Sequence, residues 1–146
     1  MEDFLALINL DMSNKDYIFS SFKELILFLK KESEYSLLAE LCALVGLNKN
    51  KNIVYRQMQN RSKEPENYFM IDPYDYLSFI KDNNCLFVFH SHLIGDEKES
   101  EFDKKTSENS CHAFLIYSIN TEKFNLYEPE YKDYDVNIIE GLKELL

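Results

Sequence analysis

Short apolar runs and amphipathic stretches alternate along this chain, with few glycines or prolines between them. Apolar runs of this length, rich in Val, Ile, Phe and Tyr, are typical of strands buried in a sheet. Two such runs joined by a short polar segment form a hairpin, which we expect for the last two. The expected strands cover residues 4–10, 37–45, 52–59, 85–91, 112–119 and 123–128.

Between these runs, apolar residues recur at helical spacing. The first such stretch, residues 16–31, is expected to be an amphipathic helix. Asp72 followed by Pro73 has the order of a helix cap and first turn, so a second helix should extend to about residue 81. Further helices are expected at 100–108 and 136–146, the last with its apolar stripe packed inward. This order predicts a three-layer α/β architecture, with one domain over residues 1–146.

Glu40 interrupts the otherwise apolar run 37–45. If that run is a buried strand, a carboxylate inside it is costly unless it is paired, hydrogen-bonded or near a metal. The alternative is a helix with Glu40 facing solvent, because short apolar runs cannot be assigned by period alone. A buried carboxylate is the form in which a general base is often held. Glu32 and Glu34 lie in a polar stretch and are weaker candidates for that role.

Composition narrows the class of protein. The chain has 146 residues, 45% of them hydrophobic, which suffices for one core. Its net charge of -10 argues against nucleic acid or an anionic membrane as a partner, and suits a basic partner or simply a solvated surface. The sequence has no apolar segment long enough to span a membrane, and its start, Met1-Glu2-Asp3, is unlike a secretory signal. We therefore expect a cytoplasmic protein.

Three cysteines, Cys42, Cys85 and Cys111, lie in apolar or strand-like surroundings. An odd number of cysteines in such places favours reduced thiols over disulfides. A rival hypothesis makes Cys85 or Cys111 a nucleophile partnered by a histidine, but neither shows an activating setting in the sequence.

Two of the chain's three histidines, His90 and His92, are separated by one residue at the end of an apolar run. Side chains at i and i+2 of a strand point to the same face, so both imidazoles would enter one space. Zinc accepts nitrogen and carboxylate oxygen, and a catalytic zinc site has three protein ligands. Asp103 is the natural third ligand, and Ser100, one helical turn before it, would lie beside the metal.

Each of these residues also has a structural interpretation. Ser100-x-x-Asp103 is typical of a helix cap followed by an acidic first turn. A single histidine at a strand end is more often structural than a ligand, and His112 is expected simply to begin a strand. The histidine pair changes this balance, because two imidazoles on one face without a metal would need separate partners or would repel when protonated.

Together these residues resemble the JAMM (MPN-plus) metalloproteases, whose signature is a glutamate followed by His-x-His and Ser-x-x-Asp. The resemblance covers roughly residues 40–118. The chain departs from the family pattern at two positions: Leu93 stands where proline is usual, and Ala43 stands where glycine is usual. Neither position is a metal ligand or the general base in the family's signature. The signature residues are Glu40, His90, His92, Ser100 and Asp103. The bacterial branch also often carries a series matched here by Asn60, Pro65, Phe69, Asp72 and Pro73.

The resemblance implies a mixed sheet flanked by helices, related to the cytidine deaminase fold. The cytidine deaminase signature itself, His-x-Glu with Pro-Cys-x-x-Cys, is absent. By similarity, Zn²⁺ would be held by His90, His92 and Asp103, Glu40 would act as general base, and Ser100 would donate a hydrogen bond to the oxyanion. The implied substrate is a peptide or isopeptide bond after the C-terminal glycine of a ubiquitin-like or sulfur-carrier protein.

Two alternatives remain open at this point. JAMM domains also occur as endopeptidases in phage-tail assembly or antiphage modules, and as catalytically silent scaffolds. Silent members usually lack part of the signature, whereas this chain keeps all of it. The acidic loop 93–99 is expected either to cover the site or to meet a basic substrate tail, and the sequence leaves the oligomeric state open.

Overall fold

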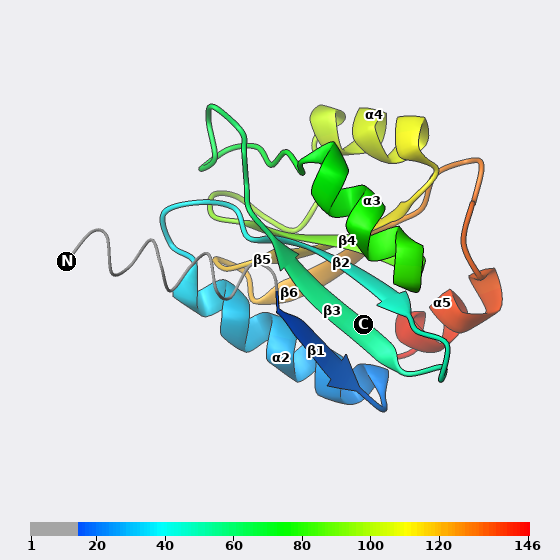
Figure 1. The fold of residues 1–146 in the computed structure, drawn as a ribbon. Helices are drawn as coiled ribbons and strands as arrows, with labels where there is room; N and C mark the ends of the chain where they lie inside the picture. Colours follow the sequence, from blue (N-terminus) through cyan, green and yellow to red (C-terminus); the bar gives the residue numbers. More distant parts are fainter. Residues whose placement is uncertain (1–14) are drawn as a thin grey trace.

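Six strands form one mixed β-sheet with helices on both faces (Figure 1). The computed structural model describes residues 15–146. The strands are β1 (Asp16–Phe19), β2 (Cys42–Leu47), β3 (Ile53–Met58), β4 (Asn84–His92), β5 (Ala113–Ser118) and β6 (Lys123–Tyr127). The helices are α2 (Phe22–Tyr35), α3 (Pro73–Asp82), α4 (Glu101–Ser110) and α5 (Val136–Lys143).

The strand order is β1-β3-β2-β4-β5-β6, and among the strands of residues 15–146 only β4 and β5 are parallel neighbours. A parallel pair needs a crossover connection, which here contains α4. The crossover leaves the sheet where β4 ends, so the end of β4 and the beginning of α4 lie at the same edge. Candidate ligands from both elements therefore meet there.

The two faces of the sheet have separate apolar cores. On one face, Leu29 of α2 and Leu142 of α5 pack against Phe87 and Leu115. On the other, Phe79 of α3 packs with Val88. This arrangement confirms the predicted three-layer α/β architecture. Among the residues described, none of the helices has the length and apolar composition needed to cross a membrane.

The prediction of one helix over residues 16–31 is wrong in its first part. Residues 16–19 form β1, which pairs antiparallel with β3 and alternates exposed and half-buried positions. The helix begins only after Ser21, whose side chain accepts a hydrogen bond from the backbone N–H of Glu24. Phe19 has helical spacing to Phe22, yet it reaches the same core from a strand.

The strand predicted over residues 37–45 is also shorter than expected. Leu37 and Leu38 are 63% and 91% exposed, and β2 begins at Cys42. Glu40 therefore lies just before the strand, although it is buried as predicted. The C-terminal apolar stripe was predicted to pack inward, and this is confirmed for Ile139 and Leu142 of α5, which are buried. Leu145 and Leu146 lie beyond the end of the helix and are about half exposed.

The remaining expected elements are confirmed within a few residues at their ends. These are the strands at 52–59, 85–91, 112–119 and 123–128 and the helices at 73–81, 100–108 and 136–146. The strand expected over 4–10 lies outside the described residues.

Candidate metal centre

His90, His92 and Asp103 converge at the edge where β4 ends and α4 begins. His90 Nε2 lies 3.1 Å from one carboxylate oxygen of Asp103, and His92 Nε2 lies 3.1 Å from the other. One ligand atom from each residue falls within 4.8 Å of the other two. The two histidines share a face because strand side chains alternate. This buried group can hold a metal ion.

The start of α4 fixes the position of Asp103 through a capping box. The Ser100 hydroxyl oxygen accepts a hydrogen bond from the Asp103 N–H at 3.0 Å, and Asp103 Oδ2 accepts one from the Ser100 N–H at 2.9 Å. The structural interpretation of Ser-x-x-Asp is thus correct, and the same contacts aim the carboxylate at the histidines. Burial alone would raise the pKa of Asp103, but the two imidazoles and the Ser100 N–H together hold it well below its ordinary value.

His90 is fully buried between aromatic rings. Phe69 stacks on it at 4.5 Å between centroids, and Phe114 meets it edge-on at 5.6 Å. Within the described part of the chain, neither ring nitrogen has a hydrogen-bond partner, since the approach of Asp103 lacks hydrogen-bond alignment. Burial lowers the pKa of His90, which favours the neutral ring. Unsatisfied buried nitrogens are costly, and metal coordination would remove that cost for Nε2.

His92 is oriented by the loop that follows it. Its Nδ1 lies 2.8 Å from the backbone oxygen of Asp96. A carbonyl oxygen only accepts, so Nδ1 must carry a hydrogen. Without a metal Nε2 also carries one and donates it to Asp103 Oδ2 at 3.1 Å, and a metal ion at the centre would take the place of that proton. Burial would lower the pKa of His92, but its hydrogen bonds with Asp103 and Asp96 raise it overall. A metal ligand with its second nitrogen held in this way is a common arrangement.

The acidic loop 93–99 therefore supports the centre through the Asp96 backbone oxygen, and hydrogen bonds to neighbouring strands hold the loop in place. The Ser118 hydroxyl donates to the backbone oxygen of Gly95 at 2.9 Å. The Asn125 side-chain amide donates to the Glu97 backbone oxygen and to the Glu99 carboxylate. These bonds fasten the loop to the end of β5 and to β6.

Glu40 lies beside the centre without joining its ligand group. Only 6% of it is exposed. Its backbone N–H donates to the Pro65 oxygen at 2.6 Å, and the next residue, Leu41, donates its N–H to the Ser91 hydroxyl at 2.9 Å. Burial raises the pKa of Glu40 to about 8, while the nearby charges of His92 and Asp103 lower and raise it, respectively. The solvent-facing helix considered for this segment is excluded.

Asn60 links Glu40 to the segment 61–70. Its side-chain amide donates to the backbone oxygens of Glu40, Pro65 and Tyr68, and its side-chain oxygen accepts from the N–H groups of Ser62 and Met70. In the sequence, Asn60 and Phe69 stand out only because they match the series often found in bacterial JAMM proteins. That match assigns no role to either residue. The contact of Asn60 with Glu40 and that of Phe69 with His90 form only in the folded chain, so the local sequence holds no signal for them.

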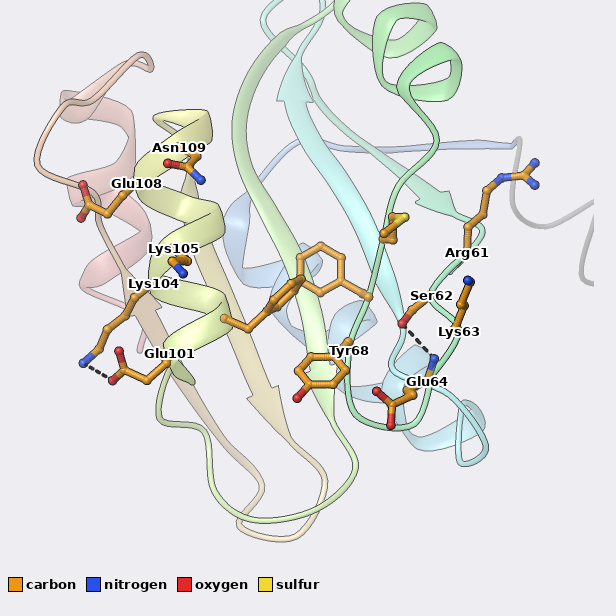
Figure 2. A pocket seen from close by; sticks show the side chains of 13 residues that line it. Arg61, Ser62, Lys63, Glu64, Tyr68, Glu101, Lys104, Lys105, Glu108 and Asn109 are labelled. Atoms are coloured by element: carbon orange, nitrogen blue, oxygen red, sulfur yellow. Dashed lines mark hydrogen bonds and ion pairs between the residues drawn. The ribbon is translucent and has the colours of Figure 1, made fainter.

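A groove of about 820 Å³ runs beside the centre, between segment 61–70 and α4 (Figure 2). Tyr68 stands on the loop side of this groove, and Lys104 and Lys105 come from the helix. Phe69, which stacks on His90, also lines the groove. Phe69 thus separates the groove from His90, and none of the three candidate ligands lines the groove.

The third histidine, Cys85 and Cys111 lie apart from this centre, whereas Cys42 is the cross-strand neighbour of His90 but does not belong to the ligand group. His112 precedes β5, as predicted, and its Nε2 lies 2.6 Å from the Tyr76 hydroxyl. All three cysteines are free thiols. Burial raises the pKa of Cys42 well above its ordinary range and that of Cys85 to about 12, which disfavours the thiolate that a nucleophile needs.

Comparison with known proteins identifies the fold alone. A scan against models of protein families finds no match, and a search of curated proteins finds none. Among solved structures, the chain is similar to the solution structure of protein DSY2949 from Desulfitobacterium hafniense, with a TM-score of 0.54 and 19% identity. The match covers 78% of this chain and 93% of that one. At such low identity the likeness supports the α/β fold and says nothing about activity.

Proposed function

We propose that this protein is a zinc-dependent peptidase or isopeptidase of the JAMM type. It would hydrolyse the bond after the C-terminal glycine of a ubiquitin-like or sulfur-carrier protein. The observation that carries the proposal is the position of Glu40: a buried carboxylate beside the His90, His92 and Asp103 group but separate from it. A metal site that serves only structure has no need of such a residue.

The donor set suits zinc. Two imidazole nitrogens and one carboxylate oxygen are the usual ligand types of a catalytic zinc site with three protein ligands. When bound, zinc would supply a water of lowered pKa and polarise the scissile carbonyl. The neutral His90 ring leaves its Nε2 available for this role, whereas zinc would have to displace the proton of His92 Nε2, with Nδ1–H kept on the Asp96 oxygen.

Residues of the chain would perform the proton transfer, stabilise the oxyanion and position the substrate. Glu40 would accept a proton from the attacking water and return one to the departing amine. Its pKa of about 8 belongs to the metal-free protein, and the positive charge of bound zinc would lower it. The Ser100 hydroxyl uses its oxygen as the helix cap, so its hydrogen remains free to donate to the oxyanion. Phe69 shields His90 from water, and the groove between segment 61–70 and α4 would orient an extended substrate.

The test combines metal content with cleavage of a reporter fused after the Gly-Gly end of a ubiquitin-like protein. Wild type should hold about one zinc per chain and cleave the fusion. Glu40→Gln should keep zinc and lose cleavage roughly 100-fold or more, because a general base contributes that much. His90→Ala, His92→Ala and Asp103→Ala should lose zinc.

His112→Gln is the matched control, because His112 is buried but lies outside the centre. It should keep both zinc and cleavage. Full activity of zinc-loaded Glu40→Gln would exclude Glu40 as the base. Retention of zinc in all three ligand variants would refute the metal site.

A further inference from the structure

The groove between segment 61–70 and α4 gathers exposed apolar side chains in one concave surface. Tyr68 is 40% exposed, Met70 58% and Phe102 37%, and all three line it. Tyr68 and Phe102 meet edge-on at 5.1 Å, and Phe69 lies between Phe102 and His90. Exposed apolar groups that line a hollow beside a metal centre mark a place where another apolar group is buried.

The rim of this groove differs in charge from the rest of the protein. It holds four of the chain's 16 basic residues but only three of its 26 acidic ones. The groove therefore has a formal charge of +1 in a chain of net charge -10.

Most of these charged rim residues already have partners within the protein. Lys104 pairs with Glu101 at 3.3 Å. Arg61 pairs with Asp72, also at 3.3 Å. The Glu108 carboxylate accepts from the Tyr127 hydroxyl and the Glu130 N–H, and Figure 2 shows it turned away from the groove.

Two rim lysines remain available to a ligand. Lys63 stands on the loop wall and Lys105 on the helix wall (Figure 2). Among the residues that the structure describes, neither has an ion-pair partner. Glu64 is the one rim carboxylate left to oppose them.

We propose that this groove binds a substrate segment in which an aromatic or large aliphatic side chain is flanked by acidic residues. This specificity rests on the proposed peptidase function and narrows its substrate class. The apolar side chain would fill the space above Phe69 and Phe102, while Lys63 and Lys105 would attract the flanking carboxylates. A strongly basic tail would be disfavoured there, because it would bring like charge to both walls of the groove.

The test measures binding without turnover, using zinc-loaded Glu40→Gln and fluorescent peptides. The reference peptide carries one phenylalanine between pairs of glutamates and ends in Gly-Gly. A second peptide replaces the glutamates with lysines, and a third replaces the phenylalanine with alanine. We expect the Kd of the reference peptide to be lower than that of the alanine peptide by a factor of about ten or more. At low salt it should also be several-fold lower than the Kd of the lysine peptide.

Charge reversal in the groove supplies the decisive comparison. The double variant Lys63→Glu, Lys105→Glu should prefer the lysine peptide. Lys31→Glu is the control, because Lys31 is equally exposed but lies on α2, across the sheet, and it should leave the preference unchanged. Metal-free wild type provides the same comparison should Glu40→Gln fold poorly.

The outcomes separate this specificity from the proposed function. Equal affinity for the acidic and basic peptides, or for the phenylalanine and alanine peptides, would overturn the specificity even if the glycine fusion is cleaved. The predicted preference in a protein that cleaves no glycine-terminated fusion would support the specificity and refute the proposed function.

Discussion

The two buried histidines of this protein use their nitrogens differently. His112 has a hydrogen-bond partner for Nε2, the Tyr76 hydroxyl, although its Nδ1 has none among the described residues. His90, more deeply buried, has no aligned partner among the described residues for either nitrogen, and its Nε2 faces a carboxylate that His92 also faces. The contrast favours a metal ion at His90 over a purely structural role.

Glu40 should make the stability of the metal-free protein depend on pH. Its pKa is raised to about 8, mainly by burial, from 4.5, so the folded state holds this proton more tightly than the unfolded state. The resulting stabilisation is fully present below pH 4.5 and is lost as pH rises through about 8. Glu40→Gln has no such proton, so wild type should lose free energy of unfolding relative to it, by up to about 1.4 kcal/mol per pH unit.

Urea unfolding of both proteins in a chelator, from pH 5 to pH 9, measures this difference. The histidines titrate in both proteins, so the comparison isolates Glu40 to a first approximation. Parallel stability curves would show that Glu40 is solvated and freely ionised.

At the level of elements, the first turn of α4 combines a helix cap with a candidate catalytic hydroxyl, and three substitutions of Ser100 separate the two. Ser100→Ala should lose about 1 kcal/mol of stability, whereas Ser100→Gly should lose only a few tenths. Both should lose cleavage roughly 100-fold if the hydroxyl donates to the oxyanion. Ser100→Thr, which keeps cap and hydroxyl, should retain most of both. Thermal unfolding and cleavage rates, measured on all three variants, test this prediction. Full activity of Ser100→Gly would show that Ser100 serves only as the helix cap.

Elements with local signals were predictable from the sequence. Asp72 and Pro73 predict the start of α3, and the Ser100-x-x-Asp103 capping box predicts the start of α4. The first helix was predicted to begin too early, because Phe19 belongs to a strand yet matches helical spacing. The three candidate ligands could be proposed from the sequence because their spacing is local. The groups that support them could not, since Asn60, Phe69 and the Asp96 carbonyl act through contacts that only the folded chain creates.

Across the whole molecule, the sheet topology brings the parts of the centre together. Hydrogen bonds join Leu41, just before β2, to Ser91 of β4, and the β4 to β5 crossover places α4 beside them. The ligands are therefore close together only in the folded state, so a metal should bind that state in preference to the unfolded chain.

Zinc should consequently raise the melting temperature of the whole domain. At free zinc 1,000 times its Kd, binding adds about 4 kcal/mol, which corresponds to roughly 8–16 °C for a domain of this size. Differential scanning calorimetry with and without zinc measures the shift. His112→Gln should show the same shift, while His90→Ala and Asp103→Ala should show little, whatever their baseline stability. Equal shifts in all four proteins would mean that zinc binds elsewhere, because removing a ligand from the binding site must weaken the coupling between metal binding and folding.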